Sequence, residues 1–219
     1  MRNRIKVLFI TGLLAVTMVL TAACGAKKFD ASGYVKSFMD MLTKGEVEDY
    51  MKFTGESEEE AKEDYNAMTD AMMEAVGAAG VSKEVQERFK DVYVKILAKS
   101  KYTVKEAEET DDGGFKVDVE IEPITGLYDG LSEELQTEAQ EYVKKLMADG
   151  ESVDQTAITE WVFNLMLDKM EARLDSLTYG DPKTITVEIE KDDDKYKIKD
   201  EEQIGEQIGL ALIDTSTLQ

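Results

Sequence analysis

The chain contains few residue types that could carry out covalent chemistry. Among its 219 residues it has one cysteine, Cys24, no histidine, and 47 acidic residues. Without histidine, imidazole bases, Ser-His-Asp triads and His-ligated metal sites are excluded. The sequence also has no glycine-rich loop of the kind that cradles phosphates. The chemistry left to the chain is modification of the Cys24 thiol and catalysis by carboxyl groups.

Cys24 follows a segment with the three parts of an export signal. The segment begins with three basic residues, continues with an apolar run over 7–20, and ends with small residues over 21–23. The apolar run is shorter than the ~20 residues that a membrane-spanning helix needs. The sequence therefore predicts that residues 1–23 direct export.

Residues 20–25, Leu-Thr-Ala-Ala-Cys-Gly, resemble the lipobox of bacterial lipoproteins. One position departs from the family pattern, because Thr21 stands where Leu, Val or Ile is usual and Leu20 lies one step further out. The resemblance implies a signal peptide over 1–23, a diacylglyceryl thioether on Cys24 with acyl chains such as palmitate, and cleavage before Cys24. Residues 24–29 would then be a lipidated N-terminus and short tether on the extracytoplasmic face of the cell membrane. Two acyl chains make such an anchor stable, since each buried methylene contributes ~0.8 kcal/mol.

The charge of the chain limits its partners. Removal of residues 1–23 leaves 23 basic and 47 acidic residues, a net charge of −24. Nucleic acid is excluded as a partner, because its phosphates need a basic patch. The acidic segments 111–114 and 192–194 lack the ligand order of a calcium-binding EF-hand loop and fit turns instead. We therefore predict no catalytic residues, no cofactor and no metal site, and only Cys24 as a modified residue.

Hydrophobic periodicity defines the elements that follow the tether. Helical spacing extends over 30–100, with helix starts at Asp30, at the capping box of Ser57 and Glu60, and at Ser82. The pattern then changes to the two-residue period of strands and back. The later elements are predicted to be a hairpin over 102–122, helices over 131–178 with the longest beginning at Asp154, a second hairpin over 184–199, and a helix over 201–213.

The second hairpin has a predicted register. With a two-residue turn at 192–193, Ile189 faces Tyr196 on the apolar face of the hairpin, and Glu190 faces Lys195 on the solvent-exposed face. A slip by one residue would invert both faces, so the pattern specifies which side is buried.

The first hairpin contains an anomaly. Strict alternation from Tyr102 and Val104 turns Glu106 and Glu108 toward the apolar side. Either the strand ends or bulges after Lys105 and both carboxylates are solvated, or the two carboxylates line an open end of the sheet.

Together the elements predict a single α+β domain over 30–219. Helices pack on one face of a roughly four-stranded antiparallel sheet made of the two hairpins. At the level of pattern, the chain resembles small uncharacterised lipoproteins of Gram-positive anaerobes, some of which look like cystatin-type or nuclear-transport-factor-type folds.

The missing catalytic residue types and the anchor favour a domain that binds a partner and is not an enzyme. Its contacts would be the membrane, through the lipid on Cys24, and a protein, a cell-wall component or a small molecule. The alternative is an envelope hydrolase that uses two carboxyl groups about 5 to 9.5 Å apart.

Overall fold

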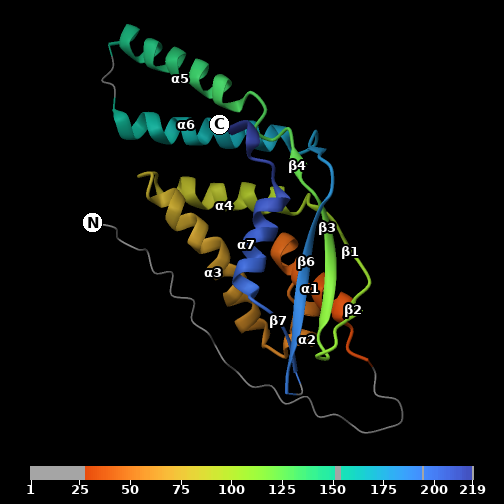
Figure 1. Cartoon of the computed structure of the whole chain (residues 1–219). Helices are drawn as coiled ribbons and strands as arrows, with labels where there is room; N and C mark the ends of the chain where they lie inside the picture. Colours follow the sequence, from red (N-terminus) through yellow and green to blue (C-terminus); the bar gives the residue numbers. More distant parts are fainter. Residues whose placement is uncertain (1–27, 151–153, 194, 219) are drawn as a thin grey trace, which may run out of the picture.

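The computed structural model describes residues 28–150, 154–193 and 195–218 (Figure 1). The predicted signal peptide, Cys24 and most of the tether therefore lie outside the described residues. None of the described helices combines the length and the apolar character that a membrane span requires. In chain order the elements are α1 (Ala31–Lys44), α2 (Glu48–Thr54), α3 (Glu58–Gly77), α4 (Lys83–Leu97), β1 (Lys101–Val104), β2 (Glu108–Glu109), β3 (Phe115–Glu122), β4 (Ile124–Thr125), α5 (Leu131–Ala148), α6 (Gln155–Arg173), β5 (Thr178–Tyr179), β6 (Lys183–Asp192), β7 (Lys195–Ile198), α7 (Glu201–Leu212) and a 3-10 turn (Ser216–Leu218).

The helix starts follow the local capping signals. The Asp30 carboxylate accepts a hydrogen bond from the Gly33 amide at 2.8 Å and begins α1. Ser57 and Glu60 form the predicted capping box at the start of α3. Each side chain satisfies a backbone N–H that has no partner inside the helix, so these short-range signals fix where the helices begin.

The two predicted hairpins join into one antiparallel sheet. The strand order is β1-β3-β6-β7, and the short β2 also pairs with β3. β3 and β6 are neighbours at the centre, so each hairpin contributes one central and one outer strand. Along β3 the residues alternate between buried and exposed; the buried residues are Phe115, Val117, Val119 and Ile121. The predicted fold class, α+β with a four-stranded antiparallel sheet, is confirmed.

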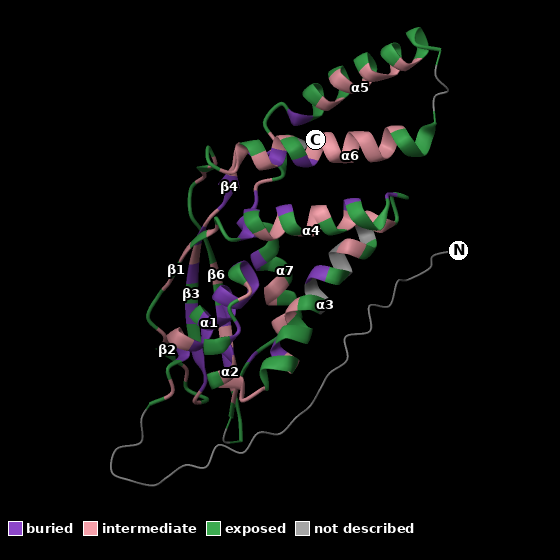
Figure 2. Ribbon diagram, turned by 180° about the vertical axis from the view of Figure 1, so that it is seen from behind, coloured by how far each residue is buried: buried purple, intermediate pink, exposed green. Residues whose placement is uncertain are grey.

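Two helices, α1 and α7, contact the apolar face of the sheet, and a third, α4, packs behind α1. α1 contacts β1 and β3, α7 contacts β3 and β6, and α4 packs on α1. The core lies between these layers, where Figure 2 shows the buried residues gathered. Its fully buried side chains include Val35, Met39, Ile96, Val119 and Ile208.

The chain leaves the sheet between its two halves to form a helical hairpin, which we call the α5–α6 arm. β4 and β5 pair at the base of the arm, where Thr125 lies opposite Thr178 and their hydroxyls are 2.8 Å apart. α6 packs against α4 on one side and α5 on the other. Figures 1 and 2, which are opposite views, place the arm at the end of the molecule away from the β6–β7 turn.

The prediction of helix up to residue 178 is wrong at its end. α6 stops at Arg173, and Thr178 belongs to β5 because it pairs with β4. For the same reason α6, with 19 residues, is not the longest described helix, since α3 has 20.

The predicted register of the second hairpin is wrong by two residues. Ile189 faces Ile198, and Glu190 faces Lys197. A shift of two keeps every side chain on its predicted face, because the strand period is two. In this register the Lys197 ammonium lies 3.1 Å from both Glu190 and Asp192.

A bulge resolves the anomaly in the first hairpin. Val104 faces Val119 and Glu108 faces Lys116, so three residues, 105–107, oppose two, 117–118. Glu106 and Glu108 are both exposed. The strand therefore bulges after Val104, and the hypothesis that the two carboxylates line an open end of the sheet is wrong.

Candidate functional site

The residues just after the predicted anchor are fixed at one end of the domain. The Lys28 ammonium lies 2.7 Å from the Glu109 carboxylate of β2. The Phe29 ring stacks on Tyr196 of β7, with 4.1 Å between ring centroids. Phe29 also packs against Tyr34 and Phe53 in edge-to-face contacts. The chain that leads back to Cys24 therefore emerges beside the turns of the two hairpins.

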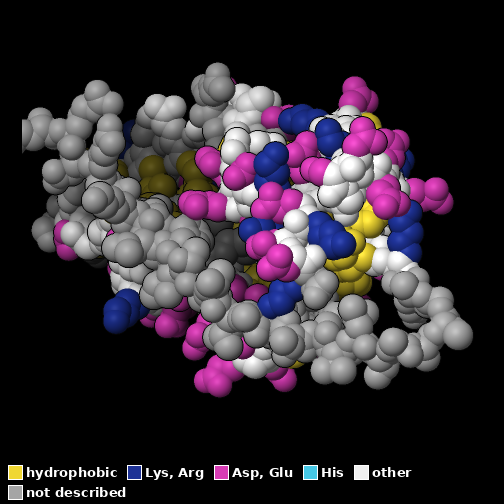
Figure 3. Space-filling model, turned by 60° about the horizontal axis from the view of Figure 1, so that its bottom comes forward, with side chains coloured by type: hydrophobic (Ala, Val, Ile, Leu, Met, Phe, Trp, Pro, Cys, Tyr) yellow, Lys and Arg dark blue, Asp and Glu magenta, His cyan; other side chains and the backbone are white. Residues whose placement is uncertain are grey.

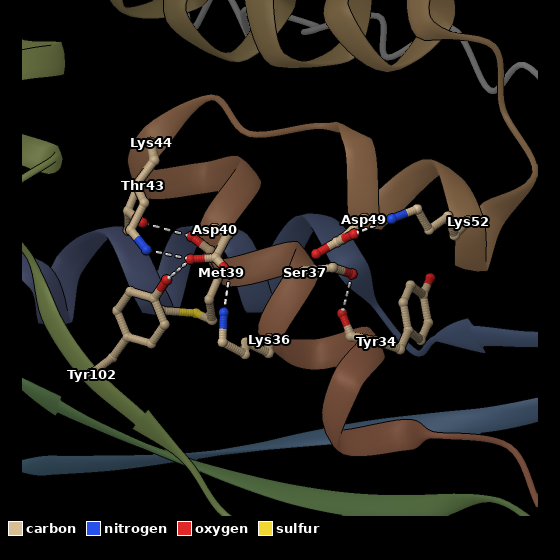
Figure 4. Close-up of polar contacts among 10 residues, drawn as sticks. All are labelled: Tyr34, Lys36, Ser37, Met39, Asp40, Thr43, Lys44, Asp49, Lys52 and Tyr102. Carbon is tan, nitrogen blue, oxygen red and sulfur yellow. Dashed lines mark hydrogen bonds and ion pairs between the residues drawn. The ribbon is translucent and has the colours of Figure 1, made fainter.

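Asp40 forms a buried ionic cluster on the inner side of α1 (Figure 4). Only 6% of the residue is exposed. Lys36 and Lys44, one helical turn before and after it, each donate a hydrogen bond to its carboxylate at 2.5 Å, and the Tyr102 hydroxyl of β1 donates a third at 2.5 Å. Burial alone would raise the pKa of Asp40, but the three hydrogen bonds outweigh it and lower the pKa to about 2. Because both oxygens have partners, the carboxylate holds α1 on the sheet and is not poised to react.

A second cluster of carboxyl groups lies where α2, α3 and α7 meet. The Tyr50 hydroxyl donates to Glu201 Oε1 at 2.8 Å and joins α2 to the start of α7. Burial raises the pKa of Glu201, and the neighbouring Asp64 raises it further. Burial also raises the pKa of Glu56, whose Oε2 atom is buried without a hydrogen-bond partner among the described residues.

This carboxyl cluster borders an open depression of about 400 Å³, lined by Asp200, Glu201, Glu202, Gln203 and Glu206. A carboxyl group with a raised pKa can serve as a general acid, which makes Glu201 the best-placed residue for the hydrolase alternative. Within the described ranges, no group of three or more acidic, cysteine or histidine side chains is arranged to hold a metal ion.

The α5–α6 arm differs from the rest of the domain because its apolar residues are only partly covered. Among the apolar residues of α6 the structure fully buries only Leu167 and Met170. The half-buried residues of this helix are Ile158, Trp161, Val162, Phe163, Leu165 and Met166. In Figure 2 the arm is mostly coloured as intermediate or exposed.

Polar contacts on two sides of α6 hold the arm in place. The Lys169 ammonium bridges Glu134 and Glu138 of α5 at 2.9 and 2.7 Å. On the other side, Arg88 of α4 pairs with Glu171 at 3.1 Å. Each such partly exposed pair contributes little to stability, but together they fix the spacing of the three helices.

An apolar groove opens on α6 between these two rows of contacts, and we call it the arm groove. Phe89 of α4 forms one wall, the start of α5 forms the other, and two methionines of α6 form the floor. The cavity is about 200 Å³, and its lining residues are Phe89, Tyr128, Leu131, Ser132, Leu135, Met166 and Met170. Flexible thioethers beside aromatic rings make a surface that adapts to an apolar guest.

The sequence analysis does not predict the arm groove, although the composition of α6 contains a related signal. Apolar residues occur on every side of α6, a pattern that indicates a helix covered on several sides. α4 and α5 cover α6 only in part, and the periodic pattern of α6 does not show which of its sides these helices leave open. The Asp40 cluster was also missed, though lysines at 36 and 44 flank it at helical spacing.

The architecture defines the class of the protein. It is an α+β domain in which helices cover one face of an antiparallel sheet and a helical hairpin is inserted between the two halves of that sheet. No family model matches the chain, and no curated protein sequence matches it significantly.

A solved structure shares this fold: the crystal structure of a candidate lipoprotein, ycdA, from Bacillus subtilis subsp. subtilis str. 168. The two are 18% identical in sequence, with a TM-score of 0.61. The match covers 84% of this chain and 56% of the other, so this chain spans little more than half the length of its structural neighbour. At this level of identity the likeness concerns the fold.

Proposed function

We propose that this chain is a lipid-anchored protein of the extracytoplasmic membrane face whose domain binds a partner protein without catalysis. The observation that carries the proposal is the arm groove, an apolar cavity on a helical hairpin that the rest of the domain leaves partly uncovered. The lipobox-like segment around Cys24 supports the anchor, as does a fold shared with a candidate lipoprotein. The pattern of the chain, similar to the small lipoproteins of Gram-positive anaerobes, agrees with this assignment.

The size of the arm groove favours a protein partner over a small molecule. Small-molecule pockets usually enclose about 300 to 1,000 Å³, whereas the arm groove encloses about 200 Å³. A cavity of this size suits one or two apolar side chains, and such anchors supply most of the energy in protein interfaces. We therefore expect an apolar side chain of the partner between Phe89, Leu135 and Met166.

Site-specific photocrosslinking tests the proposal. A photoreactive residue is placed at Ser132, on the rim of the groove, in the full-length protein on cells. We expect one defined protein adduct that Leu135→Glu abolishes. The matched control is Leu210→Glu on α7, which changes another apolar residue, 73% exposed and outside the groove, and should leave the adduct unchanged.

Two outcomes would contradict this proposal. An adduct that is insensitive to Leu135→Glu would show that the groove is not the binding site. A small bound molecule, detected by native mass spectrometry of the purified protein and displaced by Leu135→Glu, would replace the protein partner with a small ligand.

The hydrolase alternative rests on one observation, the raised pKa of Glu201 beside an open acidic depression. Its test is turnover of cell-wall glycans by the purified protein and by Glu201→Gln. Hydrolysis that the substitution removes would support the enzyme. Absence of turnover, together with a Glu201→Gln variant that still binds the partner, would contradict the hydrolase and favour a non-catalytic binding domain.

A further inference from the structure

We propose that the domain stands on the membrane on the end formed by the β2–β3 and β6–β7 turns, so that the α5–α6 arm points away from the lipid. This inference rests on the proposed lipidation of Cys24. It goes beyond that proposal because it assigns the lipid-facing surface of the domain and the direction in which the arm groove opens.

The predicted tether between Cys24 and the domain is short. Three residues separate Cys24 from Lys28. Four residue steps reach at most ~14 Å even when the chain is fully extended. A lipid on Cys24 therefore keeps Lys28 within that distance of the bilayer surface, apart from the length of the lipid headgroup itself.

Lys28 and Phe29 are held against the domain by specific contacts. Lys28 pairs with Glu109 and lies over the Phe115 ring at 5.9 Å. Phe29 stacks on Tyr196 near the end of the β6–β7 hairpin. The anchor point is thus tied to the start of β3 and to β7, and it cannot move along the sheet without breaking these contacts.

β3 runs from the anchored end of the domain toward the arm. Phe115 lies at the anchored end, and the strand runs for eight residues to Glu122, after which β4 leads into the arm. At ~3.4 Å per residue, β3 alone spans roughly 27 Å, about twice the reach of the tether. The arm therefore lies beyond the sheet on the side opposite the anchor, as Figures 1 and 2 also show.

Charge disfavours contact between α3 and an anionic membrane surface. α3 carries seven acidic residues and one lysine, so anionic lipid would repel it. The proposed lipid-facing end is itself acidic, since residues 188–199 carry four lysines and five acidic residues and residues 106–112 carry five acidic residues and no basic one. Seen from the hairpin end, basic and acidic side chains are intermixed (Figure 3). Such a surface suits contact with headgroups without insertion into the bilayer.

Fluorescence quenching from the lipid surface tests the orientation. The full-length lipidated protein is reconstituted in phosphatidylcholine vesicles that contain a lipid with a nitroxide on its headgroup. Asp111→Cys, in the β2–β3 turn, and Met147→Cys, near the end of α5 where the side chain is 65% exposed, each receive one fluorophore. We expect several-fold stronger quenching at position 111 than at position 147, and equal intensities after detergent disperses the vesicles. Equal or stronger quenching at position 147 in intact vesicles would overturn the inference.

The same experiment separates failure of the orientation from failure of the anchor. Cys24 is the only cysteine of the chain, and a thioether would leave it no free thiol. The unsubstituted protein should therefore take up no maleimide fluorophore. Labelling of the unsubstituted protein would contradict lipidation itself, whereas an unlabelled protein whose variants show reversed quenching would contradict the orientation alone.

Discussion

Replacement of Asp40 by asparagine should destabilise the domain in a way that depends on pH. The Asp40 carboxylate is buried against Lys36, Lys44 and Tyr102, and its pKa is lowered from 3.8 to about 2. Because the folded state has the lower pKa, the stabilisation is complete above the unfolded pKa and is lost as the pH falls through the folded one. At 1.36 kcal/mol per pKa unit, the difference corresponds to roughly 2.5 kcal/mol at pH 7.

Asparagine resembles the protonated carboxyl in shape and charge, so Asp40→Asn should lose about the same 2.5 kcal/mol at pH 7. At pH 3, which lies between the two pKa values, roughly half of that difference should remain. This difference is measured by urea unfolding of the original protein and of Asp40→Asn at pH 7, 5, 4 and 3, with the free energies of unfolding compared at each pH.

Asp49→Asn is the matched control, since it makes the same change in an ion pair with Lys52 that is fully at the surface (Figure 4). Surface pairs of this kind contribute little, so this variant should unfold like the original protein at every pH. A loss for Asp40→Asn that stays constant from pH 7 to pH 3 would refute the electrostatic reasoning and assign the effect to packing. A loss no larger than that of the control would refute the role of the cluster.

Three further predictions concern other parts of the fold. Glu201→Gln should raise the free energy of unfolding at pH 7.5, because burial raises the pKa of Glu201 and its ionised form therefore costs stability above the unfolded pKa of 4.5. The amide oxygen of glutamine can still accept the hydrogen bond from Tyr50. This gain in stability should shrink toward pH 4, and a gain that persists at pH 4 would contradict the reasoning. Gly45→Ala should lower the melting temperature, with a cost of about 1 kcal/mol, because the residue ends α1 at a φ of 69° that alanine adopts poorly; an unchanged melting temperature would refute it. The single tryptophan, Trp161, stacks on Tyr142 within the arm, with 4.3 Å between the ring centroids. Tyr142→Ala should therefore shift the unfolding transition seen by Trp161 fluorescence more than the transition of the whole domain seen by circular dichroism. Equal shifts would show that the arm unfolds together with the sheet.

Short-range chemistry explains which parts of the fold could be predicted from the sequence. Asp30, Ser57 and Ser82 cap helices through contacts with residues three positions away, so the capping signal and the structure coincide. The alternation along β3 likewise specifies the buried face of the strand. The predicted register of the second hairpin is wrong by two residues because both registers keep the same faces, so the alternation of apolar and charged residues does not distinguish them.

Long-range contacts explain the rest. The helical sequence pattern extends as far as Thr178, yet this residue pairs with Thr125, 53 residues earlier, and therefore belongs to a strand. The arm groove depends on how far α4 and α5 cover α6, and the apolar pattern of α6 does not say which side stays open. The predicted modification site, Cys24, follows from a local sequence pattern and lies outside the described residues, so it stays a prediction.

The β4–β5 pairing at the base of the arm makes the arm an insertion that can vary between related proteins. Its two ends meet where Thr125 lies opposite Thr178, and the sheet on either side is held by β3 and β6, which pair from Phe115 opposite Ile189 to Ile121 opposite Lys183. The 52 residues between Thr125 and Thr178 therefore enter and leave the domain at nearly one point. Shortening or exchanging them changes the entropy of closing that loop only slowly with its length. Related chains could thus carry different binding arms on one sheet, as long as a helix in the place of α6 still packs against α4.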